Sequence, residues 1–228
     1  MKIKGLIIFI TTIFIVFVIY LSFLDRKVYY LVLGDYLNNN SNNSYTYLVK
    51  KQLVDENRLE TYITEFQQDD ARVKDLLNQI EDNKTISYKG KQKTLKNALI
   101  KADLVILSIG SNDLFYRLDN NPDLNEGLYD KADEILNDLD QLFELLKEYC
   151  KEDILFISFY NPYNSEYDEL IAYMNDKLNK MTEKYGIYLV NITNCTTNNI
   201  KLSKKENICV YEKIKDQLKI SLYERKFD

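Results

Sequence analysis

Two short polar turns carry the residue types in this sequence that could do chemistry. Gly34-Asp35-Tyr36-Leu37 follows the apolar run VYYLVL, and Gly110-Ser111-Asn112-Asp113-Leu114 follows the apolar run LVILSI. In folds built from parallel strands, sites lie beyond the carboxyl ends of the strands, so the two turns are candidates for one site. Each turn taken alone also fits helix capping, in which a short polar side chain accepts from exposed N–H groups.

The chain contains no histidine, the side chain that most often transfers protons near neutral pH and the commonest metal ligand in proteins. Any catalysis would need a different base, and we expect no metal ion and no cofactor. Cys150, Cys195 and Cys209 have no C-x-x-C spacing, which signals neither a zinc site nor a disulfide framework. We expect buried or unreactive thiols, with a bridge between Cys195 and Cys209 as the alternative.

Alternating strand and helix patterns must position the two turns. Short apolar runs rich in β-branched and aromatic residues predict five buried parallel strands, at residues 28–33, 59–64, 104–109, 154–159 and 187–192. Apolar residues at helical spacing, with charged residues opposite, predict helices around residues 73–80, 132–146, 167–181 and 211–218. The expected fold is α/β, a doubly wound three-layer α/β/α sandwich with a mostly parallel five-stranded sheet. Residues 38–43 and 193–207 are expected to form long loops.

Composition sets the remaining limits on the domain. The 228 residues are 46% hydrophobic and 29% charged, which suits one globular domain, placed at residues 28–228. The formal net charge is −5, and no basic stripe interleaved with aromatic residues is present, so a nucleic-acid partner is not expected.

The first 27 residues predict a membrane anchor. Residues 5–24 contain no charged side chain and are long enough, at about 1.5 Å per residue, to cross a hydrocarbon core of about 30 Å. We expect a single transmembrane helix in the lipid bilayer at 5–24, because no small-residue cleavage site precedes Asp25. Lys2 and Lys4 balance Arg26 and Lys27, so charge does not decide the orientation. We expect the large domain to lie outside the cytoplasm; a reversed anchor and an atypical signal peptide are the alternatives.

Together, the two turns resemble the motifs of the SGNH/GDSL hydrolase family. The resemblance covers most of residues 28–225 and includes FQQDDARVKDLL at 66–77, which looks like the family's block of a glycine followed by a D-L-L helix. In that family a serine after Gly-Asp attacks an ester or acyl carbonyl. Its N–H, the middle-block glycine N–H and an asparagine side chain hold the oxyanion, and a D-x-x-H near the C-terminus supplies the base. The positions that match the family are Gly34, Asp35, Leu37, Gly110, Asn112 and Asp113.

Of the four residues that give the SGNH family its name, the serine, the glycine and the histidine are missing here. The resemblance puts Tyr36 at the serine and Asp70 at the glycine. If VYEKI at 210–214 follows the missing histidine block, Lys205 falls near the histidine and Ser203 near the aspartate. Loss of a serine nucleophile or its base costs about a millionfold in rate, so the resemblance implies a divergent member without a competent catalytic set.

The function we expect is therefore binding. The hypothesis is a membrane-anchored, extracytoplasmic pseudo-hydrolase that holds an envelope glycan, lipid or protein through the family cleft at Gly34, Tyr36, Gly110, Asn112 and Asp113. Tyr36 would fill or cover the pocket of the acyl group. One alternative is an active ester or acyl hydrolase centred on Tyr36, with Lys205 lowering the phenol pKa. Another is a structural surface domain with no pocket.

Five side chains in or near these turns have simpler expected roles. Asp35 is expected to fix its turn, and Asn112 either caps its loop or contacts the ligand. Ser41, Ser44 and Ser111 are expected to cap or to form hydrogen bonds rather than to act as nucleophiles.

Overall fold

A computed structural model describes residues 9, 11–14, 27–35, 42–119, 127–163, 165–196 and 200–219. Its core is a five-stranded sheet in the order β2-β1-β5-β6-β7, and every pair of neighbouring strands in it is parallel. The strands are β1 (Val28–Gly34), β2 (Leu59–Ile63), β5 (Leu104–Ser108), β6 (Asp153–Ile157) and β7 (Tyr188–Val190). All five predicted strands are thereby confirmed.

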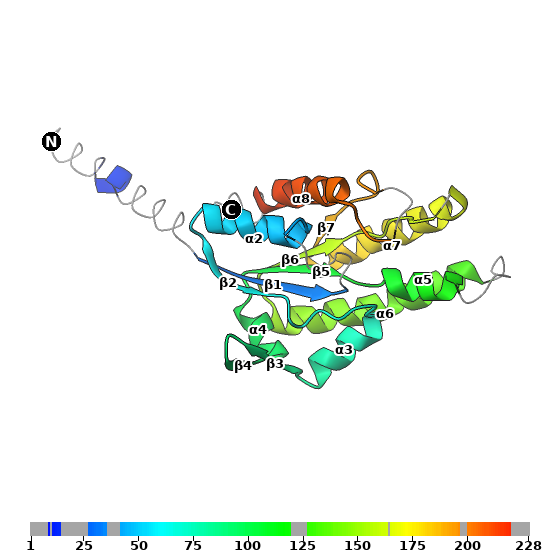
Figure 1. The fold of residues 1–228 in the computed structure, drawn as a ribbon, viewed down its shortest axis with the longest axis horizontal. Coiled ribbons are helices and arrows are strands. Elements are labelled where there is room, and N and C mark those ends of the chain that lie inside the picture. Colours follow the sequence, from blue (N-terminus) through cyan, green and yellow to red (C-terminus); the bar gives the residue numbers. More distant parts are fainter. Residues whose placement is uncertain are drawn as a thin grey trace.

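Helices cover both faces of this sheet (Figure 1). Helices α2 (Tyr45–Asp55) and α8 (Lys204–Leu218) pack together on one face. The opposite face carries α3 (Val73–Glu81), α4 (Leu95–Lys101) and α6 (Leu128–Tyr149), with α7 (Asp168–Tyr185) packed beside α6. A short helix α5 (Ser111–Asp119) follows β5, and a 3₁₀ turn η1 (Ser165–Tyr167) precedes α7. The α/β/α layering predicted from the alternating pattern is the arrangement observed.

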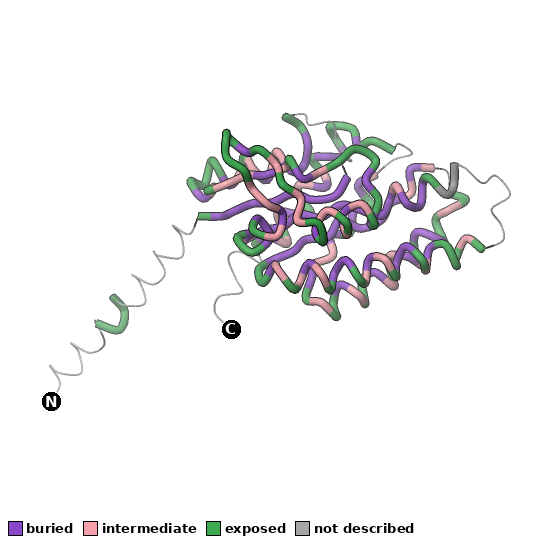
Figure 2. Tube along the Cα trace, turned by 90° about the horizontal axis from the view of Figure 1, so that it is seen from below, coloured by how far each residue is buried: buried purple, intermediate pink, exposed green. Residues whose placement is uncertain are grey.

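Burial follows the position of each strand in the sheet. Every residue of β1, β5 and β6 is buried, because these central strands have neighbours on both sides and helices above and below. β2 and β7 are edge strands and are only partly buried. The expectation that all five strands are buried is therefore wrong for these two. In the helices, buried and exposed positions alternate along the chain, as Figure 2 shows.

The predicted helices are found where the apolar stripe is clear. The stripe of α6 (Ala132, Ile135, Leu136, Leu139, Leu142, Phe143 and Leu146) is entirely buried. α7 ends at Gly186, whose φ of 62° is a left-handed helix cap that glycine adopts without strain. α8 starts with a capping box in which the Ser203 hydroxyl accepts from the Glu206 N–H and the Glu206 carboxylate accepts from the Ser203 N–H. The predicted loop at 193–207 is consequently shorter, since its last four residues are helical.

Several elements were not predicted from the sequence patterns. They are α2, α4, α5, the 3₁₀ turn η1 and a hairpin of β3 (Thr85–Tyr88) and β4 (Lys91–Thr94). Ser44, expected to be a capping residue, is the N-cap of α2, because its Oγ accepts from the Tyr47 N–H at 3.2 Å. The capping prediction is confirmed even though the helix itself was missed.

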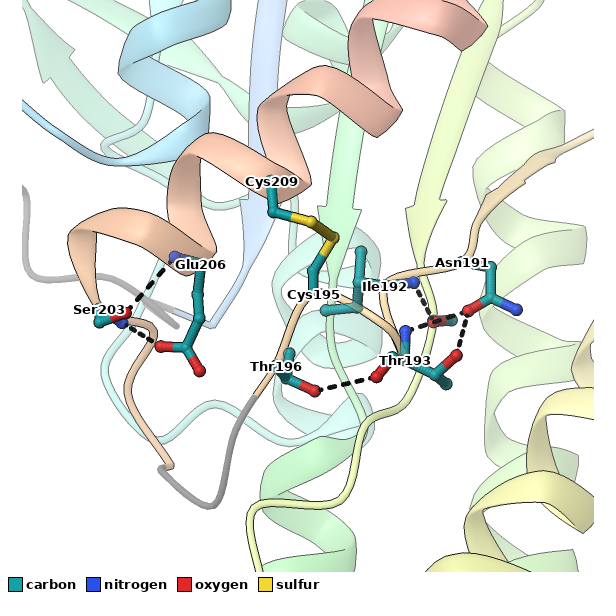
Figure 3. The surroundings of a disulfide bond; sticks show 9 residues. Asn191, Ile192, Thr193, Cys195, Thr196, Ser203, Glu206 and Cys209 are labelled. Atoms are coloured by element: carbon teal, nitrogen blue, oxygen red, sulfur yellow. Dashed lines mark hydrogen bonds between the residues drawn. A yellow bond between two sulfur atoms is a disulfide. The ribbon is translucent and has the colours of Figure 1, made fainter.

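Cys195 and Cys209 form a disulfide, which corrects the expectation of unreactive thiols for this pair. The two Cα atoms are 5.4 Å apart, a separation that a disulfide spans. Figure 3 shows that the bond joins the segment after β7 to α8. Cys150 is free and buried, as expected.

The predicted membrane anchor lies almost entirely outside the described residues, which include only 9 and 11–14 from that region. Within the described part of the chain, no helix is both long enough and apolar enough to cross a bilayer. The anchor at 5–24 stays a prediction.

Candidate functional site

The two turns predicted to form a site meet at one edge of the sheet. β1 and β5 are neighbours, with Gly34 in register with Ser108, and the Asp35 N–H donates to the Ser108 carbonyl at 2.7 Å. The carboxyl ends of these strands thus place residues 34–35 and 110–113 side by side. This convergence is what the sequence predicts.

Glycine is required at both turns for steric reasons. Gly34 and Gly110 each have a φ of 96°, which side chains of L-residues rarely allow. A Cβ on Gly34 would lie 2.0 Å from the Ser108 carbonyl oxygen, and one on Gly110 would lie 3.1 Å from the Phe159 ring. The two glycines therefore allow the backbone conformation that shapes the site.

Asp35 is buried, and its backbone is held from both sides. Besides its bond to Ser108, its carbonyl accepts from the Gln67 side-chain amide at 3.2 Å, and the neighbouring Gly34 carbonyl accepts from the Gln68 N–H at 3.2 Å. These contacts agree with the expectation that Asp35 fixes the turn. Tyr36 and Leu37 lie outside the described residues, so the placement of Tyr36 stays a prediction.

Asp70 occupies a backbone conformation that favours glycine. Its φ is 55°, in the left-handed region. Next to it, the Asn112 amide donates to the Ala71 carbonyl at 3.2 Å. The positions that the family resemblance assigns to two oxyanion donors are thus adjacent. One of them carries a carboxylate, and the amide at the other is engaged by the backbone.

A cavity of about 420 Å³ opens at this point. The described residues that line it are Asp70, Arg72, Asn112, Phe115, Tyr116 and Ile200. The Arg72 guanidinium lies 5.3 Å from the centre of the Tyr116 ring, in cation–π range. The cavity therefore combines an aromatic wall with one carboxylate, one guanidinium and one amide.

Most of the lining could not be predicted from the motifs. Arg72, Phe115, Tyr116 and Ile200 were not singled out, although Phe115 and Tyr116 follow the Gly-Ser-Asn-Asp block directly in the sequence. Ile200 reaches the cavity from the segment before α8, and its carbonyl accepts from the buried Tyr160 hydroxyl.

Asp113 is buried and is not among the described residues that line the cavity. Its carboxylate accepts from the Val73 N–H at 3.0 Å, at the start of α3. Burial raises the pKa of Asp113 to about 6, while the bond from Val73 and the charge of Arg72 act in the opposite direction. Of the residues expected to bind the ligand, Asn112 is thus the one that the described cavity exposes.

Lys205 and Ser203 lie apart from this lining. Ser203 caps α8, and Lys205 is exposed on the first turn of that helix. Among the described lining residues, Asp70, Arg72 and Tyr116 carry ionisable side chains. The positions that the family resemblance assigns to the histidine and its aspartate therefore contribute nothing to the described lining.

Comparison with known proteins places these features in a family. The sequence model of GDSL-like lipase/acylhydrolase matches residues 29–218. No curated protein sequence matches the chain.

Three solved structures are similar to this fold. A lipase from a goat rumen metagenome has a TM-score of 0.68 at 15% identity, over 82% of this chain and 95% of that one. An acetylxylan esterase from Geobacillus stearothermophilus has a TM-score of 0.64 at 14% identity, over 86% and 95%. A second acetyl xylan esterase has a TM-score of 0.63 at 14% identity, over 83% and 99%. With the motif turns converging at one sheet edge and the family match covering nearly the whole domain, the chain belongs to the GDSL-like lipase/acylhydrolase family.

Proposed function

We propose that this protein is a non-hydrolytic member of its family, which binds a ligand in the cavity beside Asp70 and Asn112. The observation that carries the proposal is the carboxylate of Asp70 in the cavity lining, in a chain without histidine. The family resemblance assigns Asp70 to the glycine of the oxyanion hole and, in the separate motif at 34–37, assigns Tyr36 to the attacking serine.

The electrostatics support binding over acyl transfer. A carboxylate about 4 Å from a developing oxyanion repels it by about 1 kcal/mol in water and about 4 kcal/mol at an effective dielectric near 20. A hydrogen-bond donor at that position normally stabilises the oxyanion by about 3 kcal/mol. Asp70 therefore opposes the transition state that the family fold stabilises, in addition to the loss of nucleophile and base.

The cavity lining favours a saccharide among the envelope ligands. Phe115 and Tyr116 offer ring faces, while Asp70, Arg72 and Asn112 offer hydrogen-bonding groups. A cavity for a lipid chain would be lined mainly by apolar side chains. Two of the similar structures are named as acetyl xylan esterases, which makes an acetylated xylo-oligosaccharide the first ligand to test.

Residues 5–24 would anchor the domain in the membrane, with the binding cavity outside the cytoplasm. The Cys195–Cys209 disulfide supports this orientation where the flanking charges do not. Disulfides persist in oxidising compartments and are rare in the cytosol. Protease treatment of intact cells that produce the full chain should degrade the domain; complete protection would contradict the proposed side.

The decisive experiment measures ester hydrolysis and binding on the same preparation. With p-nitrophenyl acetate, the wild type should release no more product than Tyr36→Phe or a mock purification, while an active family esterase serves as positive control. Calorimetry with acetylated xylo-oligosaccharides should show binding without turnover, weakened about fivefold in Tyr116→Ala through loss of the aromatic contact. Tyr129→Ala, which removes another exposed tyrosine, should leave the affinity unchanged.

The alternative is an esterase with a Tyr36-centred site, favoured by the family match and the esterase neighbours. Hydrolysis that is present in the wild type and absent in Tyr36→Phe would establish that alternative and overturn our proposal.

A further inference from the structure

A second and larger cavity lies at the same end of the domain, between the loops that follow β6 and β7. Its volume is about 710 Å³. The described residues that line it are Asn161, Tyr163, Ser165, Asp168, Ile171, Ala172, Thr193 and Thr196. None of them belongs to the motif turns or to the lining of the first cavity.

The chemistry of this lining is polar and lacks a positive charge. Hydroxyl groups come from Ser165, Thr193 and Thr196, and no lysine or arginine is among the described lining residues. A phosphate or another anionic ligand would meet the carboxylate of Asp168 without a cation to balance it. A lipid chain would have to displace water from the hydroxyl and amide groups without replacing their hydrogen bonds.

Part of this wall is held in place before any ligand arrives. The Asn161 side-chain N–H donates to the Asp168 carboxylate at 2.8 Å, and the Asn161 side-chain oxygen Oδ1 accepts from the Tyr163 N–H at 2.9 Å. On the other wall, Thr193 and Thr196 flank Cys195, so the disulfide to Cys209 restrains that wall (Figure 3). A restrained cavity loses less conformational entropy when it binds a ligand.

Aromatic side chains connect the two cavities. Tyr163 lines the second cavity and Phe115 lines the first. Their ring centres are 5.7 Å apart in an edge-to-face contact, and Phe115 also packs on Tyr160 with ring centres 6.2 Å apart. The cavities therefore share one aromatic partition, and a long ligand that passes over it would occupy both.

We infer that the second cavity is a binding site for the neutral sugar units of an oligosaccharide whose other end occupies the first cavity. Hydroxyl, amide and carboxylate groups beside a tyrosine ring suit a neutral polyhydroxylated ligand, which needs many hydrogen bonds and a flat apolar surface. The volume lies within the range of sites for drug-sized molecules, so it accommodates more than one sugar unit. The inference rests on the proposed function, since it extends the ligand bound at the first cavity.

The test fills the second cavity without removing any contact. Ala172 is exposed on α7 and lines the cavity, so Ala172→Phe adds bulk inside it. Asn179→Phe puts the same side chain at an exposed position of the same helix outside the cavity, at the loss of one exposed hydrogen bond to Glu183, and is the control. Calorimetry compares xylobiose with xylohexaose and chitobiose with chitohexaose on the full chain, with thermal unfolding to verify folding.

In at least one series, the wild type should bind the hexamer about tenfold more tightly than the dimer, and Ala172→Phe should abolish this difference while Asn179→Phe retains it. The inference is overturned if hexamers and dimers bind the wild type equally, if neither series binds, or if folded Ala172→Phe keeps the preference. Dimer affinity that survives in Ala172→Phe would leave the first cavity, and with it the proposed function, intact. Hydrolysis that depends on Tyr36 would instead overturn the proposed function alone.

Discussion

Gly34 and Asp70 lie at two positions where the family resemblance expects a glycine, and they differ in how much room a side chain has. At Gly34 a side chain would collide with the backbone of the next strand, at 2.0 Å from the Ser108 carbonyl oxygen. Asp70 has the same sign of φ, at 55°, but it is exposed and opens onto the cavity. Steric contact with the neighbouring strand therefore requires a glycine at Gly34. The exposed position of Asp70 accepts a side chain at a small conformational cost.

The largest expected loss of stability follows from adding a methyl group at Gly34. Gly34→Ala should destabilise the domain by about 4 kcal/mol or more, because the positive φ and the collision with Ser108 combine. Chemical denaturation of the purified variant measures the loss. Gly90→Ala is the matched control, since Gly90 has a φ of 73° but no atom within 4 Å of the added Cβ. Gly90→Ala should lower the free energy of unfolding by only about 1 kcal/mol. Equal losses in both variants would show that the collision with Ser108 does not matter.

Opening the disulfide should have the next largest effect. Cys195 and Cys209 are 14 residues apart, a loop whose closure restrains the unfolded chain by about 3 kcal/mol. The double variant Cys195→Ser, Cys209→Ser should unfold at a correspondingly lower denaturant concentration, with or without reductant. The wild type should unfold at the same denaturant concentration as the double variant only when reductant is present. If reductant does not change the unfolding midpoint of the wild type, the two thiols are not paired.

The buried carboxylate of Asp113 should make stability depend on pH. The folded-state pKa of Asp113 is raised to about 6, so the folded protein binds this proton more tightly than the unfolded chain does. Stability should therefore fall as the pH rises from about 4 to about 6, by about 2–3 kcal/mol if the other groups do not change. Asp113→Asn keeps an oxygen that accepts from the Val73 N–H and should remove this fall. An identical pH profile for the variant would refute the assignment.

The smallest change in stability is expected at Asp70. Asp70→Gly removes a side chain from a left-handed conformation and should raise stability by about 0.5 kcal/mol. Asp70→Ala should not raise stability, because the left-handed conformation costs alanine more free energy than it costs aspartate. Neither variant should hydrolyse p-nitrophenyl acetate above background, because both still lack the serine and the histidine. Activity in Asp70→Gly alone would mean that the carboxylate was the sole block.

The sequence predicts those parts of the fold that burial dictates. The central strands are continuous apolar runs because both of their faces are covered, so β1, β5 and β6 are visible without coordinates. The hairpin of β3 and β4 was missed because its strands TISY and KQKT are four residues long and largely exposed, with little apolar pattern. Helix α2 follows an asparagine-rich stretch, and tyrosine and threonine form part of its buried face, so its stripe is weak.

The candidate site divides in the same way. The turns at 34 and 110 were predictable because they depend on local backbone geometry and on the order of strands. The contribution of Ile200 to the cavity lining, the absence of Lys205 from the described lining and the pairing of Cys195 with Cys209 all depend on the path of the chain between β7 and α8. No periodicity in that segment encodes its path.

The hydrogen bonds that hold the backbone at the end of β1 should slow amide hydrogen exchange there. Strand ends usually fray, yet the Asp35 amide is bonded to Ser108 on one side while Gln67 and Gln68 bind the adjoining carbonyls on the other. Its deuterium uptake should therefore be as slow as that of amides in the middle of β1 and governed by unfolding of the whole domain. The turn after β1 would then be one of the last parts of the domain to open to solvent.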